Sequence, residues 1–162
     1  MKILIAIIII AGLGWAFICA MNQKMTTENE QTLAYFEVFK DIYHDTPEIN
    51  TETKYVAVDF SGVQLANVTD LKKMVEKYCF DNAKTYVDAN FEELKAQGLA
   101  TDSDFREGVL IYFSNPKLSE NELVVGAAKW RSDSQFISGT YTVKKKFWFI
   151  KVRDSVTNNS LS

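Results

Sequence analysis

The sequence has little cysteine, proline or histidine: two cysteines, two prolines and one histidine in 162 residues. Cys19 lies in an apolar run near the N-terminus and Cys79 stands alone, so the rest of the chain has no cysteine pair for an internal disulfide. Stability must therefore come from a hydrophobic core, in which Cys79, at an apolar helical position, is expected to be a small buried residue.

Catalytic and nucleotide motifs are also missing. The chain has no P-loop, no Gly-x-Gly-x-x-Gly and no Gly-x-Ser-x-Gly. The single histidine, His44, follows Asp41 at a helical spacing, but nothing nearby specifies a third metal ligand, and a helix-end histidine bonded to terminal carbonyls is the simpler interpretation. We therefore predict no catalytic residue, no metal and no cofactor.

Acidic and basic residues are unevenly distributed. Residues 25–125 hold 19 acidic and 9 basic side chains, a balance of −10, whereas residues 126–162 hold 2 acidic and 7 basic ones, a balance of +5. The simpler interpretation is that the two parts neutralise each other within one fold. The alternative is a basic surface at Lys144, Lys145 and Lys146 that meets anionic lipid or an envelope polymer. The acidic balance of the larger part argues against nucleic acid as a partner.

A long uncharged run opens the chain. Ile3–Ala20 contains eighteen residues without a charge, and as a helix it would be about 27 Å long, close to the thickness of a bilayer core. A cleaved signal peptide and a lipoprotein signal fit less well, because bulky Phe17 and Ile18 precede Cys19 where small residues are preferred. We therefore expect a retained single-pass anchor, with Ile3, Ile10, Trp15 and Ala20 in contact with lipid.

Basic residues on the two sides of this run slightly favour a cytoplasmic N-terminus, with Lys2 on one side and Lys24 on the other. The predicted location is thus the cell membrane with an extracytoplasmic C-terminal part, or secretion after cleavage as the alternative. The small pair Gly12 and Ala16 also permits helix packing in the membrane, as in an accessory subunit of a membrane complex.

The chain divides into four predicted regions: anchor 1–20, polar spacer 21–32, one folded domain 33–154 and a flexible tail 155–162. Apolar residues at helical spacing predict a helix over 33–43 and a second helix that Thr69 caps and that runs to Cys79. A capping box, Asn90 with Glu93, begins a third helix that Gly98 ends. Strand composition marks 55–60 and 85–87, and from Gly108 onward four apolar runs follow at 108–114, 122–131, 135–144 and 146–153.

Helices followed by short-linked strands predict an α+β fold in which helices pack on a curved, mainly antiparallel sheet that ends in a four-strand meander. Three stretches, 129–131, 139–143 and 147–150, resemble those of small exported domains with a cystatin-like or NTF2-like curved sheet. More narrowly, residues 55–152 resemble exported or membrane-anchored proteins of Gram-positive bacteria. The resemblance implies a concave sheet face, and the candidate ligand-binding residues are Asp59, Trp130 and Tyr141.

Together these features predict a membrane-anchored binding module that acts outside the cytoplasm without catalysis and contacts an envelope protein or polymer. Two alternatives remain open: a small-ligand or enzymatic domain that uses the concave face, and an accessory subunit of a membrane complex. A carboxylate such as Asp59 in a sheet pocket would be the base in the enzymatic alternative.

Overall fold

The computed structural model describes residues 25, 27–119, 122–146 and 149–161. The predicted anchor, with Ile3, Ile10, Trp15 and Ala20, lies outside these described residues. Within them, every helix is too short or too polar to cross a bilayer.

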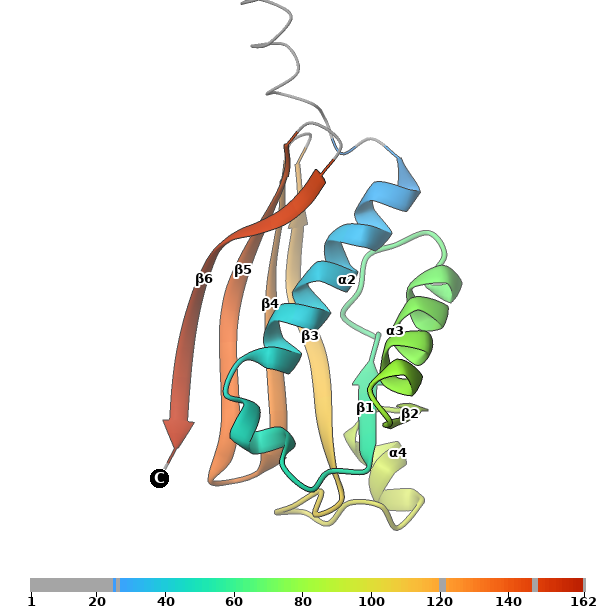
Figure 1. Ribbon diagram of the computed structural model, residues 1–162, viewed down its shortest axis with the longest axis vertical. Helices are drawn as coiled ribbons and strands as arrows, with labels where there is room; N and C mark the ends of the chain where they lie inside the picture. The colour runs from blue at the N-terminus through green and yellow to red at the C-terminus, as the bar shows by residue number, and fades with distance from the viewer. Residues whose placement is uncertain (1–24, 26, 120–121, 147–148, 162) are drawn as a thin grey trace, which may run out of the picture.

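One mixed sheet and three α-helices make up the described fold (Figure 1). In chain order the elements are α2 (Glu28–His44), the 3-10 helix η1 (Pro47–Asn50), β1 (Tyr55–Asp59), α3 (Thr69–Asp81), β2 (Thr85–Asp88), α4 (Phe91–Ala96), β3 (Gly108–Leu118), β4 (Glu122–Ser132), β5 (Gln135–Lys146) and β6 (Phe149–Leu161). The strand order is β2-β1-β3-β4-β5-β6. β1 runs parallel to both β2 and β3, and each later strand is antiparallel to its neighbour.

The predicted α+β class, with three helices and antiparallel strands at the C-terminal end, is confirmed. The parallel pairs were not predicted. They arise because α3 lies in the connection from β1 to β2, and α4 lies in the connection from β2 to β3. A connection that contains a helix is long enough for the next strand to run in the same direction as the one before it.

Several element boundaries differ from the predicted ones. α2 begins at Glu28, inside the predicted spacer, because Thr27 and Glu30 form a capping box with bonds of 3.3 and 3.4 Å. α3 begins at Thr69 instead of being capped by it, and the Asn67 side chain accepts the Thr69 N–H. β6 continues to Leu161 through the predicted tail, because backbone pairing with β5 does not require apolar side chains.

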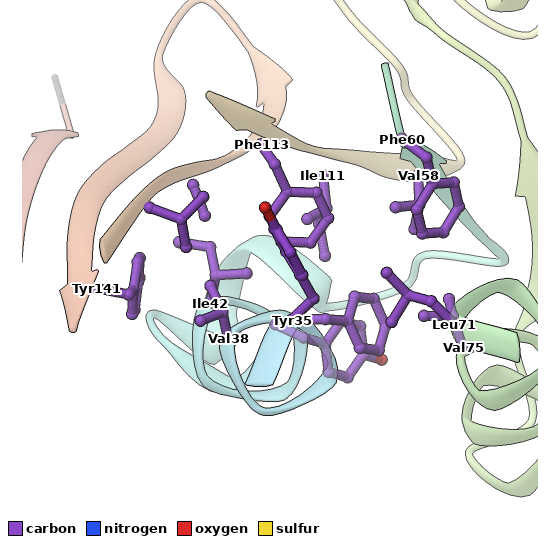
Figure 2. Packing of buried hydrophobic residues seen from close by; sticks show 14 of the residues in the cluster. Tyr35, Val38, Ile42, Val58, Phe60, Leu71, Val75, Ile111, Phe113 and Tyr141 are labelled. Atoms are coloured by element: carbon purple, nitrogen blue, oxygen red, sulfur yellow. The ribbon is translucent and has the colours of Figure 1, made fainter. Parts of the chain in front are cut away.

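The main core lies between one face of the sheet and the helices α2 and α3. Figure 2 shows side chains of both helices meeting those of β1, β3 and β5 in one cluster. Tyr35 of α2 packs edge-on against Phe113 of β3, with ring centroids 5.6 Å apart. Cys79 of α3 is 1% exposed, which confirms the prediction of a small buried residue, and burial raises the pKa of its thiol to about 12.

A smaller core lies on the opposite face of the sheet, under α4. Leu94 of α4 and Phe105 of the following loop pack there against Ala57 and Leu110 of the sheet. Because α4 is a helix of six residues, this second layer covers only the β2-β1-β3 end of the sheet. The face of β4 and β5 beyond it has no helix over it in the described part of the chain.

A buried lysine joins α2 to the sheet. Lys129 of β4 is fully buried, and its ammonium donates to the carbonyls of Tyr43 (3.0 Å), Asp45 (2.5 Å) and Thr46 (3.3 Å). These carbonyls lie at and just beyond the C-terminal end of α2, where a helix dipole favours a cation. Two residues on, Arg131 donates to Ile49 and Thr51 carbonyls in and after η1. The two side chains thus fix the end of α2 and the following turn on β4.

We expect the buried Lys129 to make stability depend on pH in the alkaline range. Burial lowers the pKa of Lys129 from 10.5 to about 8, although Asp45 and Glu48 raise it. Between these values the unfolded chain binds more protons than the folded one, so the free energy of unfolding rises with pH. Relative to Lys129→Met, the wild-type protein should gain up to about 3 kcal/mol between pH 8 and 10.5, measured by urea denaturation.

The Met variant keeps a buried aliphatic side chain that does not ionise. All other groups that titrate at alkaline pH are the same in both proteins. Parallel stability profiles for the two proteins across this pH range would contradict a lowered pKa of Lys129 in the folded protein.

Candidate functional site

The uncovered face of the sheet is the candidate binding surface. Side chains alternate along each strand, and the register places Tyr112, Ala128 and Ser138 in one row across β3, β4 and β5. The next row consists of Ser114, Gly126 and Thr140. Small side chains in both rows leave a hollow of about 450 Å³.

Gly126 leaves room for the side chain of Ser114. A Cβ at Gly126 would lie 2.5 Å from the hydroxyl oxygen of Ser114, so a larger residue would force that side chain to move. The floor therefore combines hydroxyl groups with short apolar side chains, which suits a ligand that has both kinds of surface.

An aromatic pocket adjoins the hollow at the edge of α4. It has a volume of about 360 Å³ and is lined by Asp59, Phe91, Asp102, Leu110, Tyr112 and Trp130. Tyr112 lines both depressions, so they form one continuous surface. The pocket brings together the last residue of β1, the first residue of α4, the loop after α4, the N-terminal half of β3 and the C-terminal end of β4.

The capping box of α4 positions one aromatic wall. The Asn90 side chain accepts the Glu93 N–H at 3.0 Å, and the Glu93 carboxylate accepts the Asn90 N–H at 2.8 Å, as the sequence predicted. The helix therefore begins at Phe91, whose ring meets Trp130 edge-on at 5.1 Å between centroids. This geometry is favourable for the quadrupoles of two aromatic rings.

Two carboxylates line the pocket in different ways. Asp102 forms an ion pair with Lys95, whose ammonium also lies 5.4 Å from the centroid of the Phe91 ring. The hydrogen bond to Asp102 raises the pKa of Lys95. Asp59 instead accepts the Ser61 N–H at 2.8 Å and forms no ion pair with any other described residue. Asp59 is therefore a partly buried anion without a cationic partner in the described fold.

The structure brings together two of the three predicted ligand-binding residues. Asp59 and Trp130 line the same pocket, whereas Tyr141 is fully buried on the opposite face, in the core under α2. Tyr141 shares the face of Ile137 and Val143 because strand side chains alternate with a period of two. It therefore cannot contact a ligand that occupies the pocket.

Sequence reasoning missed Phe91, Asp102, Leu110 and Tyr112. Leu110 and Tyr112 carried one usable signal, since they alternate with the core residues Val109 and Ile111 along β3. For Phe91 and Asp102 there was no such signal, because only the folding of α4 and its loop onto the sheet brings them to this place.

Two lysines of the predicted basic surface, Lys144 and Lys145, form ion pairs with acidic residues. Lys144–Lys146 belong to β5 and not to a turn. Lys144 pairs with Glu122 at 3.1 Å, and Lys145 pairs with Glu30 of α2 at 2.5 Å. Both pairs join the basic C-terminal part to the acidic rest of the chain, as the self-neutralising interpretation of the charge asymmetry expects. The side chain of Lys146 lies outside the described residues.

His44 lies far from the pocket. It is the last residue of α2, and its Nε2 is 2.5 Å from the hydroxyl of Tyr78 on α3, which replaces the predicted terminal carbonyls as its partner. Both residues belong to the helix layer on the other side of the sheet, so His44 and Asp59 do not form a pair. Across the described ranges, no three His, Cys, Asp or Glu side chains come together as metal ligands.

Comparison of this chain with family models, with curated proteins and with solved structures finds no match. The cystatin-like or NTF2-like resemblance therefore stays a prediction from the residues that suggested it. Functional interpretation rests on the chemistry of the pocket and of the hollow beside it.

We expect loss of the α4 cap to destabilise the wall of the pocket. Asn90→Ala removes the acceptor for the Glu93 N–H and should lower the free energy of unfolding by about 1 kcal/mol. Asn90→Asp, which retains an acceptor, is the matched control and should stay near the wild-type value. Urea denaturation measures the stability, and hydrogen exchange at residues 91–96 should accelerate in the Ala variant alone. Equal values for the two variants would show that the cap does not hold α4 in place.

Proposed function

We propose that this chain is a membrane-anchored, extracytoplasmic binding module that holds its ligand on the uncovered face of the sheet, without catalysis. The observation that carries the proposal is the pocket lined by Phe91, Tyr112 and Trp130 together with a carboxylate, Asp59, that has no ion-pair partner among the described residues. Concave sites with apolar walls and few polar groups are typical of ligand binding.

The distribution of reactive groups supports binding over catalysis. The titratable side chains that line the pocket are Asp59, Asp102 and Tyr112, and burial raises the pKa of Tyr112. The histidine lies on the other side of the sheet, and the Cys79 thiol is buried with a pKa of about 12. A nucleophile with an adjacent base, as in covalent catalysis, is thus not assembled at this pocket within the described chain.

The membrane part of the proposal rests on the uncharged run Ile3–Ala20 and on the start of the folded domain. α2 begins at Glu28, so only a short stretch separates the predicted span from the domain. A domain on so short a connection would stay close to the bilayer surface, where it would meet other envelope components.

Protease treatment of intact cells tests the membrane arrangement. With the full chain expressed in a bacterial host, we expect added protease to remove residues 21–162 from the outside while a cytoplasmic marker stays intact. Protection until lysis would place the domain in the cytoplasm, and a soluble, N-terminally shortened product in the medium would indicate a cleaved and secreted protein.

Fragment binding tests the location of the ligand site. In an NMR screen of the full-length protein in lipid nanodiscs, we expect fragments to shift the methyl signals of Leu110 and Ala128 beneath the uncovered face. Ser138→Trp, which fills the hollow, should abolish the shift of Ala128, whereas Glu76→Trp on the exposed surface of α3 should leave both shifts unchanged. Shifts confined to the helix layer, or an Ala128 shift unaffected by Ser138→Trp, would contradict the proposed face.

A further inference from the structure

The aromatic pocket has the chemistry of a site for an organic cation. Trp130, Tyr112 and Phe91 offer aromatic surfaces, and the two remaining polar side chains of the lining are carboxylates. Aromatic faces attract cations through their quadrupoles, more strongly when the site is desolvated. Within the described part of the chain, no lysine, arginine or histidine lines this pocket.

The fold already contains one example of this recognition at the edge of the pocket. The Lys95 ammonium lies over the Phe91 ring and pairs with Asp102, so a carboxylate and an aromatic ring hold one cation between them. The other half of the pocket repeats these elements with Asp59, Tyr112 and Trp130, but no described side chain supplies the cation.

The pairing of the strands places Asp59 next to the aromatic side chains of the pocket. Asp59 is the direct partner of Tyr112 across the β1–β3 pair, and Trp130 faces Leu110 one row away on the same side of the sheet. Asp59 uses Oδ1 to accept the Ser61 N–H, and its other oxygen forms no hydrogen bond with a described residue, which leaves it available to a ligand. A bound cation would supply the counter-ion that Asp59 lacks among the described residues.

We propose that this pocket binds a guanidinium or alkylammonium group, with the apolar part of the ligand between Trp130 and Tyr112 and its charge at Asp59. The inference rests on the proposed binding function and specifies the ligand class of the same face. Two sources can supply this group: a basic side chain of a partner polypeptide, or a small free amine.

The test uses Trp130 as its own reporter. The sequence has three tryptophans, and the full-length double variant Trp15→Phe, Trp148→Phe in nanodiscs retains only Trp130. N-acetyl-arginine methylamide should change Trp130 fluorescence saturably, whereas the uncharged citrulline analogue of the same shape should bind at least about tenfold more weakly, since desolvated cation–π contacts and charge pairing are lost. Tetramethylammonium, compared with neutral tert-butanol, distinguishes a small free amine from a peptide side chain.

Two matched variants isolate the charge of Asp59. Asp59→Asn keeps an oxygen that can accept the Ser61 N–H but removes the charge, and it should weaken arginine-analogue binding about tenfold while thermal unfolding stays near that of the parent. Asp70→Asn removes one exposed charge on α3 and should leave binding unchanged.

Three outcomes would overturn the cation site. They are equal binding of the arginine and citrulline analogues, equal effects of the two Asn variants, and no binding of either cation. None of them would contradict the proposed binding face, which is tested separately by neutral fragments and Ser138→Trp. Tighter binding of tetramethylammonium than of the arginine analogue would support the cation site and assign its natural ligand to small amines.

Discussion

The buried ammonium of Lys129 determines how the helix layer meets the sheet. A charge that is fully removed from water needs partners, and Lys129 finds them in three carbonyls at the end of α2 and in the following turn. This requirement fixes where α2 ends on β4. The packing of Tyr35, Val38 and Ile42 against the sheet then follows from the helical period (Figure 2).

Covering one face of the sheet with α2 and α3 leaves the other face to α4, which is too short to cover it. The residues beyond α4 are small or hydroxylated in the centre, at Gly126, Ser138 and Thr140, and aromatic at the edge, at Tyr112 and Trp130. The same arrangement places the reactive groups away from this face, since Cys79 and His44 belong to the helix layer. A surface so organised suits recognition of a ligand.

Local elements were largely predictable because their causes are local. The Asn90–Glu93 capping box, the apolar stripe of α3 and the strand composition of β1 each depend on residues a few positions apart. The start of α2 was predicted too late because the Thr27–Glu30 capping box was overlooked among polar residues. The length of β6 was not predicted because its C-terminal residues have low strand propensity, and backbone pairing with β5 keeps them in the strand.

By itself the sequence determined the α+β class, the helices and the antiparallel C-terminal strands. Asp59 and Trp130 stay predicted ligand-binding residues, which the structure places in one pocket. Tertiary structure decided the parallel pairing of β1 and the carbonyl groups to which Lys129 donates. It also decided which face of the sheet each strand residue lies on. Alternation along β5 indicates that Ile137, Tyr141 and Val143 share a face, but only the helix packed against them shows that this face is buried. For the same reason the pocket could not be foreseen, because its walls come from five segments that meet only when α4 closes on the sheet.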